Sequence, residues 1–327
     1  MCPAFLNKGK IESCAFPFHF ERGVTMDYAI SGFNVGGLST PDSMERVVVS
    51  AEQLGYESVW SGEHVVTSVP DPSSRLSGLR TLDTIASLTF AAAKTERIKI
   101  GSGILLLPQR DPVVLAKELA GVDVLSKGRL LFGLGVGYVA GEFEALGIPY
   151  EERGARTTEY IEVLRTIWTQ EWPTFDGQFA KFSGIQSLPL PVQKPHPPII
   201  VGGRSKPALR RAVAQGDGWF GIWGLEETKA QLKELEEIAK TTERPESLGR
   251  LEISVGYPGE PGAPDGFIDA DTAKRFEDLG VDRLIANRDS ETAWTERRSD
   301  AAAPPSQEVE DRVIRFMENQ ARELGVG

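Results

Sequence analysis

The sequence predicts an α/β fold in which eight strand–helix repeats close into one (β/α)8 barrel, the TIM-barrel architecture. The clearest repeat lies at residues 98–137, where two apolar strands flank a helix with an apolar stripe. Strands and helices alternate along almost the whole chain, and no change in composition marks a second domain. A barrel of this kind commonly reaches 327 residues as one domain. A doubly wound open sheet is the alternative that the same alternation allows.

The first strand of this central repeat is interrupted by two glycines. It is otherwise almost continuously apolar, which is typical of a parallel strand covered on both faces. Gly101 and Gly103 indicate a bulge or a close approach of another group to the backbone, although an ordinary strand that tolerates two glycines is the alternative. Asp111 and Pro112 then supply an N-cap and a first-turn proline for the helix.

The other elements are predicted from apolar periodicity, helix caps and glycine or proline breaks. Thr40 and Ser205 are the predicted caps of two helices, and Asp176-Gly177 predicts a tight turn in a small hairpin insertion. The predicted strands cover residues 29–35, 57–60, 98–107, 129–137, 197–201, 218–222, 250–256 and 283–286. The predicted helices cover residues 41–54, 82–93, 112–127, 151–168, a segment after Ser205, 226–241, 272–279 and a closing segment from Pro304.

Two segments fall outside this alternation. Residues 1–25 show no periodic apolar pattern, and their apolar run AFPF is too short for a secretory signal. We expect them to be a flexible and dispensable leader, because Met26 resembles a natural start directly before the first strand. The barrel domain is then residues 26–327, with a polar C-terminal insertion at residues 289–305.

Composition argues against several classes of partner. The net charge is −11 and there is no Lys/Arg run, which disfavours nucleic acid. No apolar run reaches the roughly 20 residues of a membrane span. Cys2 and Cys14 both precede the first core element, so the sequence predicts no disulfide framework and fits a reducing cytoplasm. It offers no candidate metal site either.

In a barrel the functional face is the carboxyl edge of the strands, and Glu63-His64 follows the second strand there. Histidine can exchange a proton near neutral pH, whereas a purely structural histidine is the alternative. Of the other two histidines, His19 lies in the leader and His196 in a proline-rich approach to the fifth strand.

Gly202-Gly203 precedes the predicted cap Ser205 at the same edge. Exposed backbone N–H groups before a helix N-terminus can bind an anion. Four cations crowd this element and are either an anion-binding cluster or a solvated helix face: Arg204, Lys206, Arg210 and Arg211. The run GLGVG at residues 133–137 lacks the spacing of a dinucleotide fingerprint.

Three segments in combination resemble a known family: ESVWSGEHVV, GSGILLLPQRDPVVLAKELAGVDVLSKGRLLFGLGVGY and PPIIVGGRSKPALRRAVAQGDGW. They are similar to the bacterial luciferase-like flavin oxidoreductases, most of all to the branch that uses the deazaflavin coenzyme F420. The resemblance extends over residues 26–324. It implies a cytoplasmic enzyme with a small-molecule substrate, and relatives often form homodimers through the helices beside strands 2 to 4.

The resemblance also assigns roles to residues. His64 would be the acid/base, with Glu63 as its neighbour. Gly103 and Ile104 would form a bulge with a non-prolyl cis peptide behind the flavin ring. The remaining cofactor-binding residues would be two glycines of strand 4 with a tyrosine at the rim, and a phosphate site before the helix that Ser205 caps: Gly135, Gly137, Tyr138, Gly202, Gly203 and Arg204.

Three functions remain open at this point. The leading one is an F420-dependent oxidoreductase that transfers a hydride to or from an unidentified substrate. The second is a two-component monooxygenase that receives reduced FMN from a separate reductase, and the third is a non-catalytic flavin-binding protein. Tyr138 stands where F420-dependent sugar-phosphate dehydrogenases have a glutamate, and the luciferase arginine near Val136 is missing, which disfavours both of those specific activities. We expect residues 69–80, Tyr138 and residues 289–305 to set substrate specificity.

Overall fold

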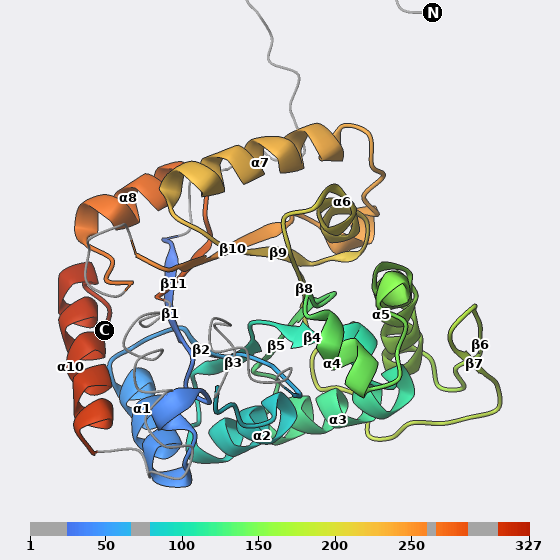
Figure 1. The fold of residues 1–327 in the computed structure, drawn as a ribbon, viewed down its shortest axis with the longest axis horizontal. Helices are drawn as coiled ribbons and strands as arrows, with labels where there is room; N and C mark the ends of the chain where they lie inside the picture. Colours follow the sequence, from blue (N-terminus) through green and yellow to red (C-terminus); the bar gives the residue numbers. More distant parts are fainter. Residues whose placement is uncertain (1–24, 67–78, 260–265, 287–306) are drawn as a thin grey trace, which may run out of the picture.

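The predicted barrel is confirmed in a computed structural model that describes residues 25–66, 79–259, 266–286 and 307–327. Eight parallel strands form a closed ring surrounded by helices (Figure 1). The ring closes because β3 pairs with β5 as well as with β2. In chain order its strands are β1 (Asp27–Ser31), β2 (Ser58–Ser61), β3 (Lys99–Ser102), β5 (Leu130–Gly135), β8 (Ile199–Gly202), β9 (Gly218–Ile222), β10 (Glu252–Tyr257) and β11 (Arg283–Ala286).

The helices pack with their apolar stripes against the outside of this ring. Their starts follow the local signals in the sequence: the Thr40, Asp111 and Ser205 side chains each accept a hydrogen bond from a backbone N–H of the first turn. The α-helices are α1 (Pro41–Gln53), α2 (Thr84–Lys94), α3 (Pro112–Leu125), α4 (Ala140–Ala145), α5 (Arg153–Thr169), α6 (Lys206–Gln215), α7 (Leu225–Ala239), α8 (Ala270–Asp278) and α10 (Gln307–Leu324).

The barrel interior is filled in layers. Its middle layer is apolar, and Trp60 stacks on Phe220 with ring centroids 5.6 Å apart. At the amino ends of the strands, the buried Arg283 pairs with Glu57 and Glu252. These layers close the barrel from below, so the carboxyl edge of the strands is the side on which a ligand can meet the interior.

The third predicted strand is divided in two. β3 ends at Ser102, the chain bulges at Gly103 and Ile104, and β4 (Leu105–Leu106) resumes the pairing with β5. A Cβ at Gly101 would lie 2.7 Å from the Trp60 ring, so the strand could not run past this indole with a larger residue there. The two glycines therefore mark a close approach and a bulge, as the first interpretation of the sequence predicted.

The structure differs from the predictions at three places, and three predicted segments lie almost wholly outside the residues that it describes. The first strand ends at Ser31 rather than at residue 35, because the next residue, Gly32, has φ +82° and turns the chain. The six-residue helix α4 was not predicted. The hairpin pairs β6 (Phe175–Asp176) with β7 (Lys181–Phe182), and its four-residue loop wraps around the Glu159 carboxylate instead of forming a two-residue turn. The leader, most of residues 69–80 and the 289–305 insertion lie outside the described residues.

Candidate active site

The predicted site residues meet at the carboxyl edge of the barrel. Glu63 and His64 directly follow β2, the bulge follows β3, and Gly135 ends β5. Gly202 ends β8, two strands from β3 around the ring. Because all eight strands are parallel, these ends open on one face.

His64 is held by an acidic residue that the sequence interpretation missed. Its Nδ1 lies 2.6 Å from Oε1 of Glu142, which belongs to the short helix α4. The other carboxylate oxygen of Glu142 accepts a hydrogen bond of 3.0 Å from Gln109 Nε2. The Glu142 side chain is completely buried, whereas the His64 ring is 16% exposed. The histidine thus stands between a buried carboxylate and the open face.

Glu63 is directed away from this pair. Its Oε2 accepts the backbone N–H of Leu106 at 2.5 Å, and its Oε1 pairs with the guanidinium of Arg110. Arg110 also reaches Asp83, the N-cap of α2, at 2.6 Å. Burial raises the pKa of Glu63, and Arg110 and the Leu106 amide oppose that shift. Glu63 therefore ties the end of β2 to the segment that follows the bulge.

The bulge forms the floor of the face. The Gly103–Ile104 peptide bond is cis, as the resemblance implied. The Ile104 side chain packs on the apolar layer of Trp60 and Phe220. It also lies directly against the backbone of two glycines. A Cβ at Gly135 would lie 2.1 Å from Ile104 Cδ1, and one at Gly202 would lie 2.8 Å from the same atom. These two glycines are what allow Ile104 to occupy this place.

The predicted anion site includes fewer basic residues than the sequence indicated. Gly203 has φ +122° and leads to Ser205, whose hydroxyl caps α6. Arg204 and Lys206 are exposed beside this helix start. Arg211, however, is buried and donates to Gly154 O and Thr158 Oγ1 of α5, and burial lowers its pKa to about 10. Its inclusion in the basic cluster was wrong, because it joins two helices.

Tyr138 lies at the rim, as expected. It is 68% exposed and its ring meets that of His64 edge-on, with centroids 6.1 Å apart. Desolvation and the nearby Glu142 carboxylate raise the pKa of its hydroxyl. The neighbouring Gly137 has φ +77°, and a Cβ there would lie 2.9 Å from the Phe143 ring of α4. The absence of a side chain at Gly137 therefore lets α4, the helix that carries Glu142, pack closely against this segment.

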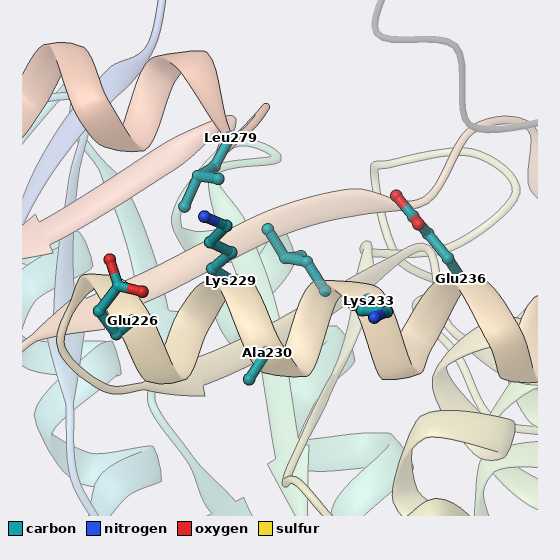
Figure 2. A pocket seen from close by; sticks show the side chains of 7 residues that line it. Glu226, Lys229, Ala230, Lys233, Glu236 and Leu279 are labelled. Carbon is teal, nitrogen blue, oxygen red and sulfur yellow. The ribbon is translucent and has the colours of Figure 1, made fainter.

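A surface hollow lies elsewhere, on the helical layer (Figure 2). It is lined by one face of α7 and by Leu279, which follows α8. The charged residues of this lining are Lys229, Lys233, Glu226 and Glu236. None of these residues belongs to the predicted site. Across the described parts of the chain, no helix is long and apolar enough to span a membrane.

Comparison with known proteins identifies the family to which this barrel protein belongs. Residues 20–259 match the model of the family described as luciferase-like monooxygenase. The chain belongs to the luciferase-like monooxygenase family. Its members named among the relatives are flavin- or F420-dependent oxidoreductases and monooxygenases, so the chain is an enzyme of that class.

Three proteins illustrate what the chain is similar to. An uncharacterized protein of Mycobacterium tuberculosis is 34% identical over 206 residues, which are 60% of this chain and 72% of that protein. The FMNH2-dependent dimethylsulfone monooxygenase of Pseudomonas putida is 36% identical over 148 residues, 44% of this chain and 40% of that enzyme. An F420-dependent secondary alcohol dehydrogenase, solved with an F420–acetone adduct, superposes with a TM-score of 0.63 at 16% identity, over 86% of this chain and 100% of that one.

Proposed function

We propose that this protein is an F420-dependent oxidoreductase that transfers a hydride between the deazaflavin and an organic substrate, with His64 as the acid/base. The observation that carries the proposal is the place of His64, half enclosed at the carboxyl edge of the barrel and hydrogen-bonded to a buried carboxylate. A protein that only binds a flavin needs no such proton-exchanging group. The secondary alcohol dehydrogenase with the same fold supports F420 as the cofactor and an alcohol or ketone as the substrate class.

The residues of the face suit a flat ring with an anionic tail. Ile104 and the two glycines beneath it offer an apolar backstop for the ring. The backbone at Gly202 and Gly203, together with Arg204, would hold the phosphate before α6. Gly135, Gly137 and Tyr138 would line the side nearest β5. F420 supplies the hydride-accepting carbon when it is bound.

The protein's own residues contribute proton transfer to the reaction. Oxidation of an alcohol to a carbonyl releases a proton from the hydroxyl oxygen, and His64 accepts it; in the reverse direction His64 returns it. Glu63 does not take part in this exchange, because Arg110 and the Leu106 amide hold its carboxylate. We assign it the role of fixing the bulge.

A second function is supported by the Pseudomonas putida relative, which is more similar in sequence over the segment that it covers. In this alternative the protein is the oxygenase of a two-component monooxygenase, and a separate reductase delivers reduced FMN to the same face. His64 and Ile104 would then serve FMN.

Two assays on the purified protein separate these functions. In the first, F420 is mixed with a panel of small primary and secondary alcohols and the deazaflavin absorbance is followed. In the second, oxygen uptake is measured with reduced FMN. The proposal predicts alcohol-dependent loss of deazaflavin absorbance, and His64→Ala should slow it by about 10²-fold while cofactor affinity stays within a small factor. Oxygen uptake with reduced FMN that is coupled to oxidation of a substrate, without any reaction of F420, would favour the monooxygenase.

A further inference from the structure

We propose that Glu142 is the positioning residue of the site: it holds His64 with the proton on Nδ1, which leaves Nε2 as the nitrogen that exchanges a proton with substrate. The inference rests on the proposed function only in taking His64 as the acid/base. Glu142 itself is completely buried, and its two carboxylate oxygens contact His64 and Gln109.

The hydrogen bonds around Glu142 set the direction of this contact. An ionised carboxylate is an acceptor only, so each of its oxygens requires a donor. Gln109 Nε2 is the donor to one oxygen, and His64 Nδ1 lies 2.6 Å from the other. With the carboxylate ionised, Nδ1 must carry a hydrogen, and the second nitrogen of a neutral imidazole is then free to accept.

Gln109 supplies the second hydrogen-bond partner of the Glu142 carboxylate. Its amide gives Nε2 to Glu142, while its buried Oε1 has no partner among the described residues. The amide thus directs a donor at the carboxylate oxygen that does not face His64, and the other oxygen is left for the histidine.

The same geometry stabilises the histidine after proton transfer. When Nε2 takes a proton, the imidazolium faces a carboxylate that is already oriented, in a place from which water is excluded because the Glu142 side chain is fully buried. A neutral acceptor there would fix the tautomer without stabilising the charge. Glu142 therefore has two separable effects, and two substitutions separate them.

Glu142→Leu removes both effects. Glu142→Gln keeps an oxygen for Nδ1, and its amide hydrogens can meet Gln109 Oε1 once that side chain turns, so it keeps the tautomer and loses the charge. Exposed Glu144 on the same helix provides the matched control as Glu144→Leu. The sequence contains only three histidines, so His64→Asn suffices to assign the His64 resonances.

The test measures the imidazole ¹⁵N chemical shifts and the turnover of each variant. We expect the Nδ1–H tautomer in wild type, Glu144→Leu and Glu142→Gln, and the Nε2–H tautomer to predominate in Glu142→Leu. In the alcohol assay, Glu142→Leu should lower kcat by about 10²-fold with KM little changed, and Glu142→Gln should lie between it and wild type.

Two results would overturn the positioning role. One is an Nε2–H tautomer in the wild-type protein, which needs no variant to fold. The other is a Glu142→Leu protein that keeps the wild-type tautomer and kcat, since a merely structural contact would move stability alone. The tautomer is read without cofactor or substrate, so its outcome stands even if His64→Ala keeps full turnover and the proposed function fails.

Discussion

Replacing Glu57 by Gln should make the stability of the barrel less dependent on acid. Glu57 lies just before β2 and receives Arg283 with both carboxylate oxygens, Nε to Oε2 at 2.8 Å and Nη2 to Oε1 at 2.9 Å. Lys99 Nζ adds a contact of 2.7 Å. The side chains of Arg283 and Glu57 are 2% and 15% exposed, so this pair is poorly screened by solvent.

The size of the effect follows from the pKa of Glu57. Burial opposes its charge, but the hydrogen bonds and charge of Arg283, aided by Lys99, lower the pKa of Glu57 from 4.5 to about 2. A difference of about 2.5, at about 1.4 kcal/mol per pKa unit, contributes about 3 kcal/mol to the free energy of unfolding at pH 7. Because the pKa is depressed in the folded state, this stability is present above pH 4.5 and is lost as the pH falls toward 2. At pH 3 about 1 kcal/mol remains by the same linkage relation.

Urea unfolding at pH 7 and pH 3 measures this contribution. Glu57→Gln should be less stable than wild type by about 3 kcal/mol at pH 7 and by about 1 kcal/mol at pH 3. Burial and the Glu57 charge raise the pKa of Asp27. Glu57→Gln removes the repulsion between these two carboxylates, so the loss of about 3 kcal/mol at pH 7 is an upper estimate. Exposed Glu308→Gln should show no such change with pH. An equal gap at both pH values would refute the reasoning.

Two further predictions concern the cofactor face. Gly135→Ala should weaken flavin or deazaflavin binding by at least about 10-fold in a fluorescence titration, because its Cβ would displace Ile104. The control Gly121→Ala lies in open space on α3; it should leave binding unchanged and raise the free energy of unfolding by about 0.5–1 kcal/mol. Replacing Arg204 and Lys206 by Gln should weaken F420 more than FMN in parallel titrations, and equal losses would remove these cations from the anion site.

Elements set by local signals were predictable from the sequence. The predicted strands at residues 218–222 and 283–286 match β9 and β11 residue for residue, since each is a short apolar run bounded by glycine or charge. Helix starts were predicted where a side chain caps its own first turn, as Asp111 does for α3. The barrel itself followed because eight such units have few ways to close.

The contacts within the site were not predictable in the same way. His64 and Glu142 are 78 positions apart and meet only because β2 and β5 bring two loops to one face. α4 has six residues, too few for a periodic pattern. Arg211 was misassigned for the opposite reason: its residue type suits anion binding, but it is buried and hydrogen-bonded to α5. The partners of Glu63, Arg110 and the Leu106 amide, were equally invisible in the sequence. Only three-dimensional contacts distinguish these uses.

The choice of cofactor tests the account most directly. A protein with net charge −11 repels the anionic tail of F420 unless a local basic patch offsets the field, and exposed Arg204 and Lys206 at the start of α6 are the described cations placed to do so. The measurement is a titration of the purified protein with F420 and FMN, oxidised and reduced, at low and high salt. The account predicts tighter binding of F420 than of FMN, with the difference shrinking as salt rises. Tighter binding of FMN at low salt would contradict it and put the monooxygenase first.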